Sequence, residues 1–331
     1  MKSQCFLFLI TLAAVIAAPL PAAAQLPVAK SPSNARTIPR TPDGHPDLQG
    51  IWTNATLTTI ERPQAFAGKA TLPDDEAARF EKQTVDTTAG DQRSSNAERD
   101  RDHAYNSLFF DNGSELARVD GIKRTALIID PADGRIPALS AEARERNAAR
   151  LRTANRFDTV KDRPLGERCL VGFGSTSGPP MMPVLYNNNY QIVQTPETVM
   201  ILVEMVHDVR VVRMNASHPP PNVRQWLGDS IGRWEGDTLV VETTNFTNKT
   251  RFRGSSDNLR VTERFNLTAP GTILYRVTVD DPATFSNAWT MEYPFLAAAG
   301  PIYEYACHEG NYAMPDILGG ARKEDASTSK K

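Results

Sequence analysis

Short runs of apolar, β-branched residues separated by turn residues dominate the second half of the chain. From residue 186 onward these runs are closely spaced, and no helical pattern separates most of them. The runs that we interpret as strands span residues 190–194, 198–206, 209–214, 239–246, 259–267, 273–280, 289–296 and 302–307, with 50–53, 124–130 and 135–139 upstream. About ten strands at this spacing predict a mainly β, antiparallel fold, closed as a barrel or stacked as a sandwich.

Helical patterns are confined to about residues 73–165, which we interpret as a helical and loop insertion. Pro73, followed by three acidic residues, is typical of a helix start. Residues 140–152 combine a Ser140 N-cap with good helix formers, and their many charges predict a helix on the surface.

The N-terminus has the pattern of a cleaved secretory signal. Lys2 precedes an apolar run at 6–20, and three alanines at 22–24 supply a cleavage site near Ala24. The apolar run is too short to span a bilayer comfortably, so we expect no stable membrane anchor; a retained anchor is the alternative. The expected organisation is a signal peptide at 1–24, an extended leader at 25–48, a single domain at 49–320 and a disordered tail at 321–331.

Signal cleavage removes Cys5 and leaves Cys169 and Cys307 in the mature chain. Two cysteines in an oxidising compartment pair more often than they stay free, so we expect a disulfide between them, with two free buried thiols as the alternative. The expected location is the periplasm or the extracellular medium.

Composition and motifs limit the classes of partner that we expect the protein to bind. The chain has 37 Lys and Arg against 39 Asp and Glu, a net charge of −2, which argues against a nucleic-acid-binding protein. We find no complete nucleotide-binding glycine pattern, phosphate-binding loop or zinc-binding helix motif. The expected partner is a small molecule, with no cofactor and no metal, and the oligomeric state stays open.

Several segments carry a resemblance to known families. The Gly50-x-Trp52 pair resembles the opening motif of lipocalin and calycin barrels, so we expect a calycin-like barrel. The chain also resembles a family of secreted proteins of acidobacteria and sphingomonads, and this resemblance implies secretion and a single folded unit but no catalytic residues. The segments that carry it are 42–52, 190–195, 224–229, 232–239 and 303–312.

His207 is the first candidate for acid–base chemistry. In a continuous strand it would share a face with the apolar residues at 199–205, as a core histidine or the one polar group of an apolar pocket. At a hairpin tip, His207 and Asp208 would instead lie at the barrel rim beside Glu204 and Arg210. The plainer alternative is a structural histidine with an ion pair near it.

His308 is the second candidate, because it follows Cys307 directly and a disulfide would fix its backbone. A histidine near a carboxylate suits general acid–base work, since its ordinary pKa is close to neutral. In a strand, Tyr303 and Tyr305 would face away from His308. The plainer alternative is a histidine that hydrogen-bonds a loop.

The late strands carry charges in mid-strand, at Glu242, Glu263, Arg276, Glu292 and Glu304. Outward placement with cross-strand pairing explains most of them. The alternative is a barrel with a polar lumen, where carboxylates, Arg276 and tyrosines face a ligand.

The function that we expect is a secreted, cofactor-independent lyase, isomerase or hydrolase that acts on a small amphipathic molecule in a barrel pocket. The alternative is a lipocalin-like protein that binds such a molecule without turnover. The candidate catalytic residues are His207, His308, Glu204 and Asp208, and the candidate substrate-binding residues are Arg210, Tyr303, Tyr305, Arg276 and Glu263.

Overall fold

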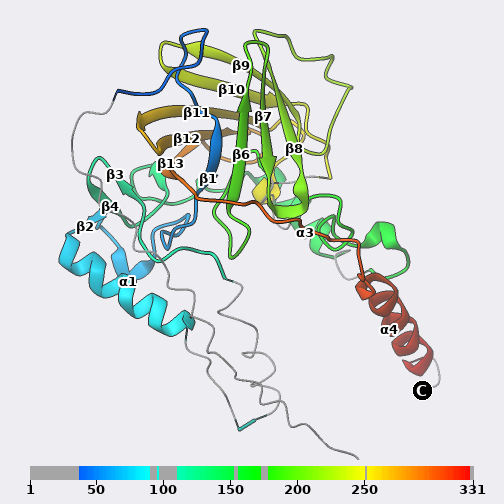
Figure 1. Ribbon diagram of the computed structural model, residues 1–331. Coiled ribbons are helices and arrows are strands. Elements are labelled where there is room, and N and C mark those ends of the chain that lie inside the picture. Colours follow the sequence, from blue (N-terminus) through cyan, green and yellow to red (C-terminus); the bar gives the residue numbers. More distant parts are fainter. Residues whose placement is uncertain are drawn as a thin grey trace, which may run out of the picture. The chain divides into compact units, whose positions relative to one another are not determined.

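The computed structural model (Figure 1) describes residues 37–89, 95–96, 110–152, 156–172, 178–249 and 252–328. The expected signal peptide and the first part of the expected leader lie outside the described residues. Every structural statement below concerns the described residues.

The fold is mainly β, and nine strands close into a barrel, which confirms the expected β-barrel and is consistent with a calycin- or lipocalin-like one. In barrel order the strands are β1 (Gly50–Thr53), β6 (Asn189–Gln194), β7 (Thr198–Val203), β8 (Val209–Met214), β9 (Asp229–Glu235), β10 (Thr238–Thr244), β11 (Arg260–Ala269), β12 (Thr272–Asp280) and β13 (Trp289–Ala297). Pairing of β13 with β1 closes the ring, and β5 (Ile128–Asp130) adds to β13.

Local sequence explains the long hairpins. Along β11 and β12 every second side chain is buried, which is the period-two pattern of a strand with one face on a core. Two-residue turns join β9 to β10 and β11 to β12. Gly236 and Gly271 adopt positive φ in these turns, a conformation that glycine takes without steric strain.

One strand pair departs from the expected antiparallel pattern. Strand β8 runs parallel to β9, and only the segments Val212–Met214 and Ser230–Gly232 are paired. Parallel neighbours cannot be joined by a tight turn, so residues 215–228 form a long crossover that returns to the start of β9. Gly232 suits this seam, because a Cβ there would lie 2.7 Å from the Met214 sulfur and 2.8 Å from a Val212 methyl carbon.

Large side chains fill the barrel interior. The largest fully buried ones include Trp289, Phe265 and the tyrosines at 190, 275 and 293. Met181, which precedes β6 in the chain, lies among them: its carbonyl accepts hydrogen bonds from the hydroxyl of Tyr293 at 2.7 Å and from the Asn54 amide at 2.9 Å. The interior is therefore a packed core rather than an open lumen.

The expected insertion contains helices α1 (Asp74–Ala89) and α3 (Ala141–Leu151), and also short strands. Ser140 caps α3 as expected, accepting a hydrogen bond from the Ala143 N–H at 2.9 Å. Strands β2 (Thr71–Leu72), β4 (Ile122–Arg124) and β3 (Arg118–Val119) form a separate small sheet.

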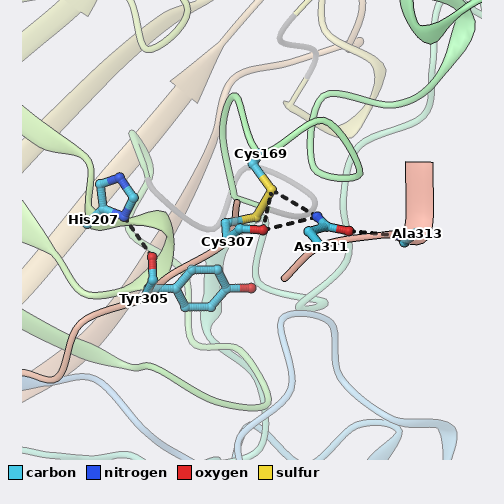
Figure 2. Close-up of a disulfide and its surroundings, with 6 residues drawn as sticks. All are labelled: Cys169, His207, Tyr305, Cys307, Asn311 and Ala313. Atoms are coloured by element: carbon cyan, nitrogen blue, oxygen red, sulfur yellow. Dashed lines mark hydrogen bonds between the residues drawn. A yellow bond between two sulfur atoms is a disulfide. The ribbon is translucent and has the colours of Figure 1, made fainter. Parts of the chain in front are cut away.

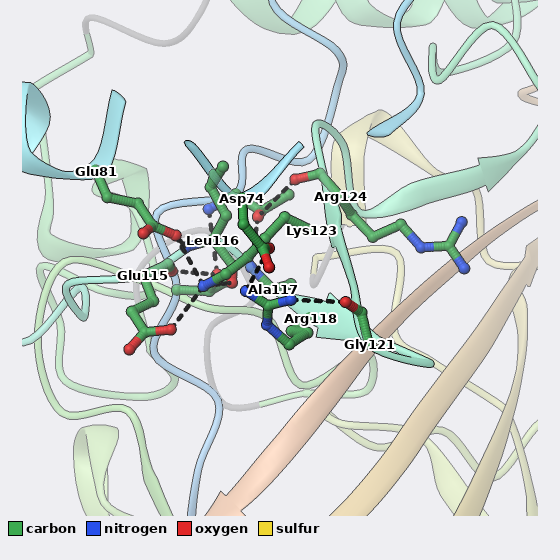
Figure 3. Close-up of polar contacts among 11 residues, drawn as sticks. Asp74, Glu81, Glu115, Leu116, Ala117, Arg118, Gly121, Lys123 and Arg124 are labelled. Atoms are coloured by element: carbon green, nitrogen blue, oxygen red, sulfur yellow. Dashed lines mark hydrogen bonds and ion pairs between the residues drawn. The ribbon is translucent and has the colours of Figure 1, made fainter. Parts of the chain in front are cut away.

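Helix α1 is joined to this small sheet by a buried lysine (Figure 3). Lys123 lies 2.8 Å from Glu81 of α1 and 2.6 Å from Glu115, and its ammonium also donates to the Leu116 carbonyl at 3.2 Å. The nearby pair between Arg118 and Asp74 is exposed by comparison.

The C-terminal segment differs from the expectation in two places. Residues 302–307 form no strand, so the alternating faces expected for Tyr303, Tyr305 and His308 are wrong. Helix α4 (Ala313–Thr328) occupies most of the segment that was expected to be a disordered tail. In Figure 1 this helix (red) ends the chain beyond an extended stretch.

The expected disulfide is confirmed: Cys169 and Cys307 are bonded across a sequence separation of 138 residues. Such a bond fits an extracellular or periplasmic protein. A search of the described helices finds none with the length and apolar character that crossing a membrane requires.

Candidate functional site

A cleft of about 790 Å³ lies beside the β8–β9 seam. Its walls come from β8, from the start of β9 and from the crossover, with a contribution from residues before β6. The charged residues that line it are Asp208, Arg210, Arg213, Arg224, Asp229 and Lys249, and the large apolar ones are Leu170, Val171, Val209, Val211, Trp226 and Leu227. The lining therefore combines apolar surface with four cationic and two acidic side chains.

The parallel pairing explains why a cleft forms at this place. Strand β8 begins at Val209, but its pairing with β9 begins only at Val212. The first half of β8 therefore has no ladder partner on the β9 side, and it lines the cleft together with crossover residues 224–228. Its end is held on the neighbouring strands, since the Gln225 N–H donates to the Asn245 carbonyl at 3.0 Å.

Arg210 lies at the base of the cleft and points into the barrel. It is buried, and its two terminal nitrogens donate to both oxygens of Glu263 on β11 at 3.0 and 2.5 Å. The Tyr275 hydroxyl donates to the same carboxylate at 2.7 Å. The Nε of Arg210 is buried and has no hydrogen-bond partner among the described residues.

Burial and charge shift the pKa values of this group. Burial lowers the pKa of Arg210, but the adjacent Glu263 outweighs that effect, and the net pKa is raised. Burial, with the Glu263 charge adding to it, also raises the pKa of the Tyr275 hydroxyl well above its usual range. Arg210 is therefore a permanent cation and Tyr275 a neutral donor.

Asp229, at the start of β9, is held from two sides at the edge of the cleft. Both of its oxygens accept from Arg213 at 2.9 Å, and the His218 Nδ1 lies 2.7 Å from one of them. The other ring nitrogen of His218 is 3.5 Å from Glu242.

Arg224, Trp226 and Lys249 form the outer part of the cleft. One Arg224 nitrogen donates to the carbonyls of Phe246 and Asp257 at 2.9 and 2.7 Å, which fixes the guanidinium on the surface. The Lys249 ammonium lies 5.8 Å from the centre of the Trp226 ring, within cation–π range.

The expected catalytic residues around His207 lie at a hairpin tip, so the continuous strand is wrong. Arg210, which the rim alternative placed beside His207, is instead buried in the barrel on Glu263. Strand β7 ends at Val203, and His207 is exposed with a positive φ. Its Nδ1 is 2.8 Å from the Tyr305 carbonyl. Glu204 is buried, accepting from the Asn189 side chain at 2.8 Å and from the Tyr303 N–H at 3.4 Å.

These contacts fasten the C-terminal segment to the hairpin tip, and they occupy the groups that were expected to act on a substrate. Asp208 and Arg210 line the main cleft, whereas neither His207 nor Glu204 does. Tyr303 is exposed, and Tyr305 lines a second hollow of about 530 Å³.

His308 is exposed in the turn that follows the disulfide, and Figure 2 shows what surrounds that bond. The Asn311 amide donates to the Cys307 carbonyl at 3.0 Å, and its oxygen accepts from the N–H of Ala313, the first residue of α4. Asn311 therefore connects the disulfide to the helix, while His308 lines neither the main cleft nor the second hollow.

Of the two charged residues Glu263 and Arg276, which were expected in a polar lumen, only one lies inside the barrel. Glu263 is inside the barrel, but Arg276 is on the outer face of β12, where it forms an ion pair with Glu292. Arg276 is therefore excluded from any site inside the barrel. Glu242 is also on an outer face, and Glu304 is on no strand.

Among the charged and aromatic residues of the cleft, five were not expected from the sequence: Arg213, Arg224, Trp226, Asp229 and Lys249. Three of them lie in the segment 224–229, one of those that carry the family resemblance, and that was the available signal. Local sequence does not show that β8 and β9 run parallel. Without knowledge of this pairing, the position of the crossover beside β8 cannot be predicted.

Among the described residues, no group of three or more histidine, cysteine or acidic side chains is placed to hold a metal ion. Comparison with protein-family models, curated proteins and solved structures finds no match.

Proposed function

We propose that this protein binds a small amphipathic organic molecule with an anionic group, and that the cleft beside the β8–β9 seam is its site. One observation carries the proposal: a hollow of about 790 Å³ in which the cationic side chains of Arg213, Arg224 and Lys249 meet a large apolar wall, with Asp229 already paired to Arg213. This is the binding alternative expected from the sequence, moved from the barrel lumen to its wall.

The packing of the barrel supports this placement. Tyrosines and other large side chains occupy the interior, so a ligand fits only where the wall opens. Arg224 and Lys249 line the cleft with positive charge, and Trp226, whose ring lies beside the Lys249 ammonium, adds an aromatic surface. A pocket with a mostly apolar wall and a few placed polar groups is typical of small-molecule sites.

Acid–base catalysis is the second candidate, and a single observation favours it. His218 is hydrogen-bonded through Nδ1 to Asp229, a cleft residue, as a general base is oriented by a carboxylate. Its other nitrogen is buried and faces Glu242 rather than the cleft. Binding is therefore the function that the geometry supports better.

The test is a ligand-observed NMR titration with hexanoate, and with hexylammonium as the probe of opposite charge. We expect hexanoate to bind and hexylammonium not to bind. Arg224→Gln and Lys249→Gln should each weaken hexanoate binding by about twofold to fivefold, the size of an exposed charge–charge contribution.

The matched control is Arg264→Gln, because Arg264 is an exposed, ion-paired arginine on β11 that does not line the cleft. It should leave the hexanoate Kd unchanged. Equal binding of the two probes, no binding of hexanoate, or an equal effect of all three variants would contradict the proposal.

A further inference from the structure

The outer face of strands β6, β7 and β8 carries an apolar patch, beside the polar outward residues Gln191, Thr198 and Arg213. The residues of the patch are Val193, Met200, Leu202, Val209 and Val211, which we call the β6–β8 apolar face. The side chains are well exposed: 37% for Val193, 40% for Met200, 52% for Val209 and 50% for Val211. In Figure 1 the three strands (green) lie side by side.

This composition is unusual for the barrel. On β11 the outward positions are held by Arg260, Thr262, Arg264 and Asn266, the polar pattern of a sheet face in contact with water. A contiguous apolar patch on a protein surface coincides with a binding site more often than expected by chance.

The strand register makes the face continuous. Val193 is paired with Met200, Met200 with Val211, and Leu202 with Val209. Directly paired residues on one face have Cβ atoms about 5 Å apart, so the side chains are in contact across all three strands.

The face leads directly into the cleft. Val209 and Val211 belong to the face and also line the cleft, so one apolar surface passes from β6 to the cationic side chains. Arg213, Arg224 and Lys249 line the cleft, where Asp229 is paired with Arg213 and Asp208 is the second acidic residue, and no outward-facing residue of the three strands is acidic.

We infer that the ligand is a single-chain amphiphile, with its anionic head group in the cleft and its hydrocarbon chain along the β6–β8 apolar face. This inference rests on the proposed function and names the class of its ligand. The inference rests on the layout of this surface, because positive charge at one end and an apolar strip at the other match a molecule with an anionic head and a hydrocarbon chain. The hydrocarbon chain of the ligand lies outside the barrel, whose interior is filled with side chains.

The dimensions set the expected chain length. Three neighbouring strands span two interstrand spacings, about 10 Å. Because an extended hydrocarbon zigzags, each carbon–carbon bond of about 1.5 Å advances it by only about 1.25 Å, so a chain of roughly eight to ten carbons crosses that distance.

The experiment is a series of NMR titrations with hexanoate, octanoate, decanoate and dodecanoate, each below its critical micelle concentration. We expect binding to become about twofold to fourfold tighter with each methylene group up to decanoate, because one side of the chain leaves water, and then to level off. Met200→Gln and Val193→Thr, which do not line the cleft, should weaken decanoate binding about tenfold and leave the hexanoate Kd unchanged.

The control is Ile122→Gln, since Ile122 is equally exposed on the small sheet far along the chain from the face. Hexanoate binding with no dependence on chain length overturns this inference and leaves the proposed function intact. No binding of any carboxylate overturns both. Sedimentation of the protein with anionic vesicles, or a dimer lost in Met200→Gln, also overturns it, because the face would then serve a membrane or a second copy.

Discussion

At the scale of single residues, the main feature is the buried, hydrogen-bonded group of Arg210, Glu263 and Tyr275. The sequence named Arg210 and Glu263 as binding residues from different arguments, and the structure brings them into one ion pair. Tyr275 was not expected, because the alternating pattern of a strand does not show which group a tyrosine hydroxyl will hydrogen-bond to. Removing one member of a buried pair leaves an uncompensated charge, which typically costs about 3–5 kcal/mol, so neither Arg210 nor Glu263 can be truncated alone without a large loss of stability.

Buried tyrosines predict a loss of stability in alkali. Burial raises the pKa of the Tyr275 and Tyr293 hydroxyls well above the value of about 10 in an unfolded chain. Above about pH 10 the unfolded chain releases protons that the folded chain keeps, so the free energy of unfolding falls as the pH rises, whereas below about pH 9 these groups add no pH dependence.

Urea unfolding between pH 8 and pH 11 measures this effect. Tyr293→Phe should reduce the slope of stability against pH by about 1.4 kcal/mol per unit above pH 10, since one proton is removed from the balance. Tyr312→Phe, at an exposed tyrosine, should keep the slope of the wild type. A Tyr293→Phe slope equal to that of the wild type would contradict the prediction.

At the scale of elements, the sequence predicted strands well and their partners poorly. Residues 190–194 and 209–214 match β6 and β8 closely, because alternation of buried and exposed positions is a local property. The expected strand at 198–206 ends early, since Val206 and His207 take positive φ at the hairpin tip. The expected strand at 302–307 is wrong because side-chain contacts and the disulfide, rather than a strand partner, hold that segment.

The small sheet and α1 give the prediction at this scale. Lys123→Met should lower the free energy of unfolding by about 3 kcal/mol, because the partly buried Glu81 carboxylate loses its cation. Arg118→Met removes an exposed pair with Asp74 and should cost less than about 1 kcal/mol. Urea unfolding midpoints compare the two, and an equal loss in both variants would be inconsistent with a buried role for Lys123.

At the scale of the whole molecule, the disulfide joins two points 138 residues apart and so encloses eight of the nine barrel strands. The sequence predicted it from the cysteine count, because the chain without its expected signal peptide offers a single possible pair. Closing a loop of this length stabilises a folded chain by up to about 5 kcal/mol in the chain-entropy model.

Reduction should therefore lower the urea midpoint of the wild type, by an amount equivalent to up to about 5 kcal/mol. It should also make the segment 298–312 sensitive to protease, because that segment is held largely by the disulfide and the hairpin-tip contacts. The Cys169→Ser, Cys307→Ser double variant should show both properties without reductant and no further response to it. A reductant effect that persists in the double variant would point to another cause.

The number of strands has a consequence for the parallel seam. Each antiparallel neighbour reverses the strand direction, and a walk once around a closed ring must return to the starting direction. A ring of nine cannot do this with reversals alone, so an odd number of its neighbour pairs must run parallel, and here that number is one. The crossover therefore follows from the odd number of strands in the ring. Point substitutions can reshape the cleft, but abolishing the seam requires the gain or loss of a strand.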